Sequence, residues 1–307
     1  MFTRQTVLLV KIESPSGTDA APEGADNAVM AFDVNLEVKS DMKERGPAND
    51  DRSLYPNIRG KTTVDLKFYV ELKGSGTAGT APKWGPLMEA CDRAETANAG
   101  TNVIYAPAAS SETCTIWLYI DGLLHKVTGC AGDCEIDLTA GDVAKLNFTM
   151  SGAYALPIDS SMAAPTFNAT IPPVVKGTTT TFGSYAAIIE KILLKFGNAV
   201  VERTSMNATE GVLAFMVGNR NPTGVMTCEA VVRATSNADF WSYFNTGASK
   251  ALSLVLGTTA GNIITLTAPA CVLAPVKYGD RDGLRLFDVE FQMARSGGND
   301  EMTITLT

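Results

Sequence analysis

The sequence is short of histidine, and this shortage excludes the commonest forms of hydrolytic catalysis. His125 is the only histidine among 307 residues. A Ser-His-Asp or Cys-His site would have to use it. It lies just after a two-residue turn, in a position typical of a surface strand, and no nucleophile-elbow sequence is present. Because no set of acid and base residues converges elsewhere, we predict that the protein is not an enzyme and has no catalytic residues.

Clusters of metal-binding residues are also missing. Cys130 and Cys134 lie near His125, but a structural zinc site needs four donors, usually arranged as two close pairs. The other cysteines are scattered, at Cys91, Cys114, Cys228 and Cys271. The acid pairs in the segments GDRDG and GNDE lack the further ligands that a calcium loop supplies at fixed spacing. We therefore expect no metal site and no cofactor.

No export signal or membrane span is visible. The apolar run of the segment MFTRQTVLLVKIE is interrupted by Lys11 and Glu13, which argues against a signal peptide. The longest apolar stretch, YAAIIEKILLKF, has Glu190 and Lys191 in its middle and is too interrupted to cross a bilayer. We expect a soluble protein made in a cytoplasm, where the thiols stay reduced and pack as small apolar groups.

Runs of basic residues are absent as well. The formal net charge is -8 and the pI is about 4.8. DNA carries about one negative charge per 1.7 Å of its axis, so an acidic chain of this kind is a poor nucleic-acid binder. It can still form a wall past which DNA slides without adhering.

Alternating apolar and polar residues are abundant, and they predict long half-buried strands in both halves of the chain. The first half has FDVNLEVK (32–39) and KTTVDLKFYVELK (61–73), and the second has EKILLKFG (190–197) and TGVMTCEAVVRA (223–234). A hairpin is predicted at Asp121-Gly122, because this pair favours the positive φ that a two-residue turn requires. The composition therefore predicts a mainly β protein.

Each half also predicts a short helix followed by closing strands. Helical spacing of apolar residues occurs at Trp84, Leu87, Met88 and Cys91, and again at Phe240, Tyr243 and Phe244. Both halves end in a Gly- and Asp-containing turn and a strand that finishes aromatic-x-Met, in LTAGDVAKLNFTM and KYGDRDGLRLFDVEFQM. This recurrence predicts a duplication, with an N-terminal domain at 1–155, a linker at 156–175 and a C-terminal domain at 176–307.

The segment GSGTAG, residues 74–79, matches the G-x-G-x-x-G pattern of dinucleotide-binding loops. That function requires a buried parallel strand before the glycines and a helix starting at the third one. Here the preceding strand alternates with charged residues, and Pro82 and Trp84 come before any helical stripe. A flexible Gly/Thr linker is the better interpretation.

A long charged segment, residues 40–61, is punctuated by Gly46, Pro47 and Pro56. A connection of this length without secondary structure is usually functional, and its counterpart around MVGNRNPTG is expected to be shorter. Isolated surface charges are usually just solvated, but a mixed-sign arm can also dock on a neighbouring copy. The candidate contact residues are Glu44, Arg45, Asp50, Asp51, Arg52 and Arg59 in this segment, and Glu202, Arg203 and Arg220 in the second half.

The chain resembles the tail tube proteins of long-tailed, non-contractile bacteriophages over nearly its whole length. The segments that are similar are ELKGSGTAGTAPKWGPLMEAC, GCAGDCEIDLTAGDVAKLNFTMSGAY, NRNPTG, DFWSYF, LGTTAGN, KYGDRDGLRLFDVEFQM and GNDE. The resemblance implies β-sandwich or curved-barrel domains, each with a flanking helix, whose sheets join those of neighbours into a barrel around a lumen. It also implies rings that stack through a long loop, here 40–61, and for a duplicated chain it implies trimeric, pseudo-sixfold rings.

The same resemblance implies a structural protein of the virion tail, assembled in the host cytoplasm, that conducts DNA into the host. Its partners would be further copies of itself, the tape-measure, tail terminator and distal tail proteins, and passing double-stranded DNA without specific binding. Asp65, Glu71 and Glu229 on the polar faces of the long strands are candidate lumen acids. The alternative is a tandem β-sandwich module that binds a receptor or carbohydrate. It predicts an exposed aromatic platform, whereas Trp84, Trp117 and Trp241 are spread over separate elements and are expected in the core.

Overall fold

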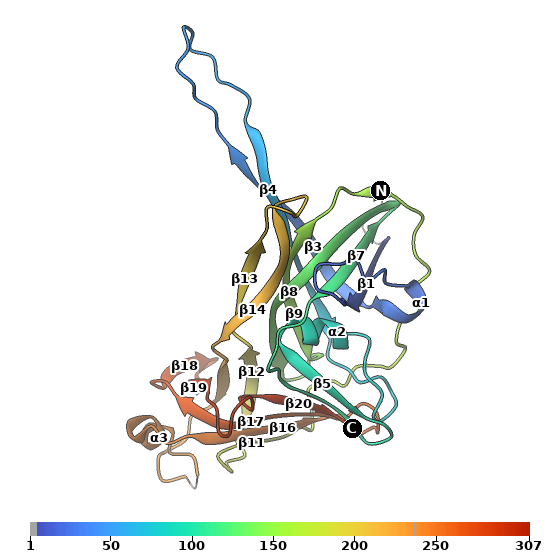
Figure 1. Ribbon diagram of the computed structural model, residues 1–307. Helices are drawn as coiled ribbons and strands as arrows, with labels where there is room; N and C mark the ends of the chain where they lie inside the picture. The colour runs from blue at the N-terminus through green and yellow to red at the C-terminus, as the bar shows by residue number, and fades with distance from the viewer. Residues whose placement is uncertain (1–4, 236) are drawn as a thin grey trace.

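The structure is a computed structural model that describes residues 5–235 and 237–307. Strands make up 52% of it and helices 6%, which confirms the mainly β fold predicted from the sequence. Figure 1 shows a body of packed sheets from which one long hairpin projects.

The first half of the chain supplies the elements β1 to β10. In order they are β1 (Thr6–Ile12), α1 (Gly24–Asn27), β2 (Ala28–Val29), β3 (Ala31–Lys43), β4 (Ile58–Glu71), α2 (Gly85–Ala90), β5 (Arg93–Asn98), β6 (Asn102–Pro107), β7 (Cys114–Ile120), β8 (Leu123–Thr139), β9 (Lys145–Tyr154) and β10 (Ile158–Asp159).

The second half supplies the elements β11 to β20. In order they are β11 (Thr179–Phe182), β12 (Ile189–Lys195), β13 (Asn198–Thr204), β14 (Val212–Arg220), β15 (Thr223–Glu229), α3 (Phe240–Thr246), β16 (Lys250–Leu256), β17 (Ile264–Leu273), β18 (Lys277–Arg281), β19 (Leu284–Met293) and β20 (Thr303–Leu306).

One continuous sheet runs through both halves. Its strand order is β3-β4-β9-β8-β12-β15-β19-β18, and each neighbouring pair is antiparallel. The halves meet where β8 pairs with β12, with Leu138 opposite Ile192 and Ile136 opposite Leu194. The backbone hydrogen bonds of the sheet therefore cross from one half to the other without a break.

A second layer packs on the apolar face of this sheet. In the first half β1 pairs with β7 and β7 with β8, and in the second half β11 pairs with β16 and β16 with β17. The C-terminal strand β20 lies between β17 and β6, so it joins the second half to the β5–β6 hairpin of the first. This layering is a β-sandwich arrangement.

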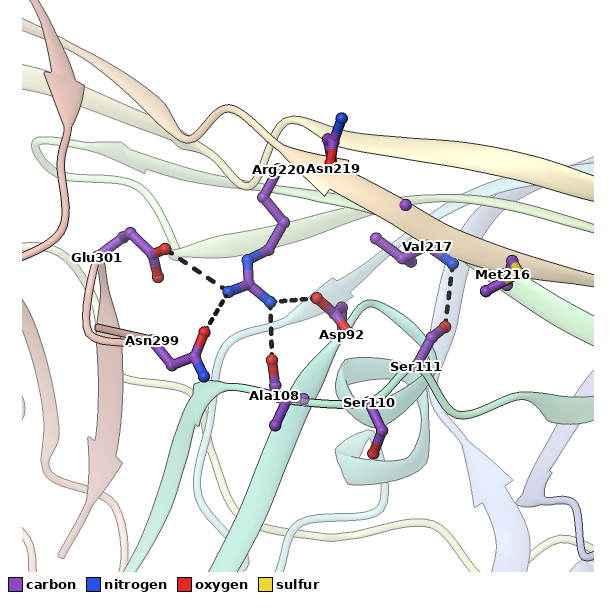
Figure 2. Close-up of a pocket in the computed structure, with 12 residues that line it drawn as sticks. Asp92, Ala108, Ser110, Ser111, Met216, Val217, Asn219, Arg220, Asn299 and Glu301 are labelled. Carbon is purple, nitrogen blue, oxygen red and sulfur yellow. Dashed lines mark hydrogen bonds and ion pairs between the residues drawn. The ribbon is translucent and has the colours of Figure 1, made fainter.

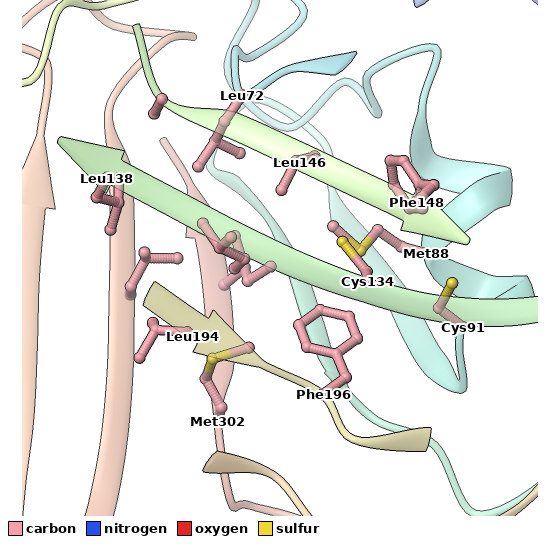
Figure 3. Close-up of a cluster of buried hydrophobic side chains, with 14 of the residues drawn as sticks. Leu72, Met88, Cys91, Cys134, Leu138, Leu146, Phe148, Leu194, Phe196 and Met302 are labelled. Atoms are coloured by element: carbon pink, nitrogen blue, oxygen red, sulfur yellow. The ribbon is translucent and has the colours of Figure 1, made fainter. Parts of the chain in front are cut away.

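The hydrophobic core follows the alternation that the sequence predicts. In β4, Leu66 and Phe68 are buried while Lys67 between them faces the other side of the sheet. A single apolar cluster extends from Phe148 in the first half to Leu194 and Phe196 in the second, as Figure 3 shows around β8 and β12. The two halves thus share one core as well as one sheet.

Helix α3 is capped by side-chain and backbone groups at its two ends. The Asp239 side chain accepts a hydrogen bond from the Ser242 N–H at 3.0 Å, and Gly247 closes the helix in the left-handed conformation with φ of 65°. Phe240 is fully buried, but Phe244 is 40% exposed. The predicted three-residue stripe therefore lies only partly in the core.

The prediction of an unstructured loop at 40–61 is wrong at both ends of the segment. β3 continues to Lys43 and β4 begins at Ile58, with these two residues opposite each other, so only residues 44–57 form the tip. The counterpart in the second half is not shorter, because a separate hairpin, β13 and β14, connects β12 to β15. Polar residues do not prevent pairing here, because the hydrogen bonds of a strand ladder come from the backbone.

The glycine-rich segment 74–79 is not the flexible linker that its composition predicts. The Gly74 N–H donates to Asn262 Oδ1 at 2.8 Å, and the Gly76 N–H donates to the Gly261 carbonyl at 3.1 Å. A Cβ atom on Gly74 would lie 2.0 Å from the Gly261 carbonyl oxygen. Glycine is needed because the backbones of the two halves approach too closely for a side chain.

Candidate assembly surfaces

The face of the long sheet opposite the core is polar and carries paired charges. Lys39 Nζ lies 2.5 Å from Asp65 Oδ2 across β3 and β4, and the Ser151 hydroxyl donates to Asp65 Oδ1 at 2.7 Å. Where the halves meet, two similar cross-strand pairs join β12 to β8: Lys191–Asp137 at 3.0 Å and Lys195–Glu135 at 2.6 Å. The polar face is therefore a row of neutralised carboxylates, not a bare acidic wall.

The candidate lumen acids all lie on this polar side of the sheet but have different surroundings. Asp65 is paired as described, and Glu71 at the end of β4 lies 3.3 Å from Lys73 Nζ. Glu229 on β15 is half-buried and lines a small cavity of about 210 Å³ with Glu190 and Arg281, which form an ion pair at 2.9 Å. Sequence patterning found the acids but not Lys39 and Lys73, which pair with Asp65 and Glu71.

The outermost strands of this sheet, β3 and β18, each have one paired neighbour within the described parts of the chain, β4 and β19 respectively. Val34 and Leu36 of β3 are only half-buried, and Val38 is 45% exposed. At the other margin, Tyr278 of β18 is 60% exposed. Monomeric proteins usually blunt or cover such edges, so both margins are candidates for contact with another chain.

The β3–β4 hairpin extends beyond the body as an arm, which we define as residues 40–61 (Figure 1). Every residue of its tip, 44–57, is exposed, including Leu54 at 97% and Tyr55 at 42%. Among the residues that the structure describes, only the base of the arm is held by the rest of the chain. There, Arg59 is ion-paired with Glu210 and Lys61 Nζ lies 2.9 Å from Glu202.

The predicted contact residues fall into separate places. Glu44, Arg45, Asp50, Asp51 and Arg52 lie on the tip, Arg59 and Glu202 lie at the base of the arm, and Arg203 is exposed on β13. On the tip, the Arg45 guanidinium is 5.9 Å from the Tyr55 ring, and Asp51 Oδ1 accepts the Ser53 N–H at 2.6 Å. Sequence reasoning missed Lys61 and Glu210, because their partners are distant in the chain.

Arg220 is engaged inside the molecule, in a polar pocket of about 750 Å³ (Figure 2). Its guanidinium forms an ion pair with Asp92, donates to the Ala108 carbonyl and to Asn299 Oδ1, both at 2.9 Å, and lies 3.6 Å from Glu301. These partners come from both halves of the chain. Arg220 thus acts as a bridge between the halves, which no local pattern could indicate.

Arg93, the residue after Asp92, is 1% exposed and its guanidinium lies 4.0 Å from the centre of the Phe196 ring. Its Nη1 donates to the Met302 carbonyl at 3.4 Å. Burial, and then the nearby charge of Arg220, lower the pKa of Arg93 to about 10, so it remains a cation at neutral pH. This buried cation adds a second bridge between the halves.

The stability of the folded chain is expected to depend on pH through Glu89 on α2. Burial, followed by the charges of Glu95 and Glu112, raises its pKa from 4.5 to about 8. Between pH 5 and pH 8 the folded chain therefore holds a proton that the unfolded chain has lost, so stability falls as pH rises. We expect the free energy of unfolding to fall by about 1–2 kcal/mol over this range. This is less than the whole pKa shift corresponds to, because the side chain is partly open to water.

The measurement is urea unfolding at pH 5 and at pH 8. Glu89→Gln should remove this part of the pH dependence and make the chain more stable than wild type at pH 8. Glu37→Gln, on an exposed strand position, is the matched control and should leave the dependence unchanged. A Glu89→Gln variant with the wild-type pH dependence would contradict the assignment.

The cysteines behave as predicted. All six are unpaired and buried, and burial raises the pKa of the Cys91, Cys130 and Cys134 thiols well above the ordinary value.

No group of His, Cys, Asp and Glu that could hold a metal ion is found in residues 5–235 and 237–307. Over the same residues, no helix has the length and apolar character needed to cross a membrane.

The tryptophans differ from the prediction that all three lie in the core. Trp84 is 3% exposed and donates its Nε1–H to the Lys73 carbonyl at 2.9 Å. Trp117 and Trp241 are only half-buried. Trp241 lies 5.7 Å from Tyr278 and 6.3 Å from Phe287, measured between ring centres, and lines an open groove of about 650 Å³ beside β18.

Comparison with known families gives one match that agrees with this architecture. The family described as phage tail tube protein matches residues 3–307. A comparison with curated protein sequences gives no match. Because the family match covers nearly all of the sequence, the chain belongs to the phage tail tube protein family.

Proposed function

We propose that this chain assembles with copies of itself into stacked rings that form the tail tube of a long-tailed, non-contractile phage. The tube serves as a conduit for DNA ejection into the host. The observation that carries the proposal is a sheet with one polar face, a single-partnered strand at each margin, and an arm whose tip packs on no other part of the described chain. Such features leave a monomer incomplete, and neighbours would complete it.

We further propose that the chain is an internal duplication and that three copies close a pseudo-sixfold ring. The strand order β3-β4-β9-β8 of the first half corresponds to β12-β15-β19-β18 of the second. The pairs β1–β7 and β11–β16 in the second layer correspond in the same way. These matches support domains at 1–155 and 176–307 joined by 156–175, with three copies of the continuous sheet closing one barrel.

In this proposal the polar face of the sheet lines the lumen, with Asp65, Glu71 and Glu229 on it or at its rims. Neutralisation of carboxylates by lysine keeps the surface highly hydrated but weakly charged. Screening limits electrostatic forces to about 8 Å at physiological salt, so DNA near the axis would meet neither a basic surface to adhere to nor a strongly repelling one. The chain would thus pass double-stranded DNA without specific binding.

The arm is the proposed contact between successive rings. Its tip has charges of both signs (Glu44, Arg45, Asp50, Asp51 and Arg52), which would set the register of stacking through complementary patches. Arg59, Glu202 and Arg203 lie nearer the base, where they would contact the neighbouring ring only at its rim. The tape-measure, tail terminator and distal tail proteins are the proposed partners inside and at the ends of the tube, with assembly in the host cytoplasm.

Negative-stain electron microscopy of the purified chain, with its mass in solution measured by light scattering, tests the proposal. We expect rings or tubes and a smallest assembled species of three times the 32.4 kDa chain mass. A folded chain that stays monomeric at high concentration would exclude a self-assembling tube. Compact monomers that bind a carbohydrate or receptor would instead support the tandem binding module.

A further inference from the structure

We propose that the start of β18 in one copy pairs antiparallel with the start of β3 in the next copy, in the register that β8 and β12 have within the chain. The aromatic groove beside β18 would then lie against the start of that β3. This inference rests on the proposed ring and specifies its lateral contact: the strands, their register and the side chains that fill the interface.

The junction inside the chain is the template for this contact. β8 and β12 pair with Leu138 opposite Ile192 and Asp137 opposite Leu193. Leu138 and Ile192 are each 2% exposed. The C-terminal end of β8 is thus covered by β12, the first long strand of the second half.

Equivalent positions follow from the pairings on either side. In the first half, Asp137 lies opposite Lys145 on β9. In the second half, Lys277 lies opposite Asp288 on β19. Both strands end in the pattern aromatic-x-Met, which is Phe148 to Met150 in β9 and Phe291 to Met293 in β19. Lys145 and Asp288 precede the aromatic residue of this pattern by the same number of positions. Lys277 therefore corresponds to Asp137, and Tyr278 corresponds to Leu138.

The first long strands correspond in the same way. Leu146 on β9 lies opposite Val70, which lies opposite Ala31 on β3. Its counterpart Val289 on β19 lies opposite Met226, which lies opposite Ile192 on β12. Ala31 therefore corresponds to Ile192, and the template places Tyr278 of one copy opposite Ala31 of the next.

The surfaces at the two margins fit this arrangement. Leu138 is buried by the second half of its own chain, whereas Tyr278 in the equivalent place is 60% exposed and Val232 beside it is 73% exposed. The groove floor is aromatic, with Tyr278 and Phe287 5.4 Å apart. On β3, Ala31 and Val34 are half-buried. An open aromatic groove is poorly suited to water, and the template places the start of the next copy's β3 against it.

The test is disulfide trapping with the pair Ala31→Cys and Tyr278→Cys. Directly opposite residues in antiparallel strands have Cα atoms about 4.5–5.5 Å apart, within the range that a disulfide spans. The six native cysteines are buried, so they do not compete. Mild oxidation should convert the rings to covalent trimers on a denaturing gel. Each single-cysteine variant should remain monomeric on that gel.

The matched control is Phe32→Cys with Tyr278→Cys. A shift of one residue turns the side chain to the other face of the sheet, so this pair should not cross-link. Rings that form without cross-linking Ala31→Cys to Tyr278→Cys, or that cross-link the control pair instead, would overturn the register while leaving the tube proposal intact. Wild-type protein that never forms rings would overturn both.

A second variant tests the groove without depending on a disulfide. Val232→Asp changes a side chain that is 73% exposed, so its melting temperature should match wild type while ring formation is lost. Rings that persist in a folded Val232→Asp variant would overturn the claim that the groove is a lateral interface.

Discussion

Replacing the tip of the arm, residues 44–57, by Asn-Gly should abolish long tubes while leaving soluble rings. Lys43 and Ile58 are opposite each other at the end of the paired strands, and Asn-Gly is a favoured two-residue hairpin turn. The shortened hairpin therefore closes without disturbing β3 or β4. Because every tip residue is exposed, its loss removes no packing from the folded chain, and the melting temperature should stay within a few degrees of wild type.

The effect should be all-or-none because the arm is the proposed axial contact, and polymerisation fails when each ring loses every copy of it. Leu54 and Tyr55 supply apolar surface on the tip, and burying apolar area contributes about 25 cal/mol per Å². Electron microscopy and sedimentation distinguish rings from tubes. Gly46→Ala is the control, since a Cβ there meets no atom within 4 Å, and it should form tubes normally. Tubes of ordinary length from the shortened chain would show that stacking uses another surface.

Replacing Glu13 by Ala should destabilise the chain by about 3–5 kcal/mol. This carboxylate is 7% exposed and directly follows β1. Its Oε2 accepts hydrogen bonds from the Gly17 N–H at 2.6 Å and the Thr113 hydroxyl at 2.7 Å. Its Oε1 accepts from the Thr115 hydroxyl at 2.8 Å and the Gly129 N–H at 2.7 Å.

Removal of the carboxylate leaves the Gly17 and Gly129 N–H groups without their acceptor, and a buried unsatisfied group costs about 1–3 kcal/mol. The Thr113 and Thr115 hydroxyls keep other acceptors, Ser16 Oγ at 2.9 Å and the Thr18 carbonyl at 3.5 Å. Water entering the cavity offsets part of the cost, which is why the total is below a simple sum. Glu13→Gln should lie between the two, because an amide keeps one acceptor but adds donors that face other donors. Denaturant unfolding measures the loss, and Glu37→Ala, at a side chain that is 59% exposed, should change stability by less than about 0.5 kcal/mol. A Glu13→Ala variant as stable as wild type would contradict this account.

Much of the secondary structure could be predicted because its signals are local. The alternation in 61–73 predicts a strand with one buried face, and β4 buries that face. The helical spacing of Phe240, Tyr243 and Phe244 predicts a helix, and α3 lies there.

The candidate surfaces could be predicted only in part. The sequence indicated a projecting charged segment at 40–61, but not that its ends are strands or that Glu210 and Glu202 brace its base. It suggested an intersubunit role for Arg220, while the structure places that guanidinium among partners from both halves of the chain. Pairing of charges across the sheet was also hidden, because strand register between distant segments leaves no local trace.

The sequence alone determined that the chain is mainly β and that it resembles a tail tube protein, and it predicted that the two halves follow one plan. These features depend on side-chain periodicity and turn residues, which act over a few positions. Only the tertiary structure decided that the halves share one sheet through β8 and β12, that Gly74 must be glycine, and which margins stay open. Those outcomes depend on contacts between residues far apart in the chain, where close packing and strand register, rather than local preference, determine what can fit.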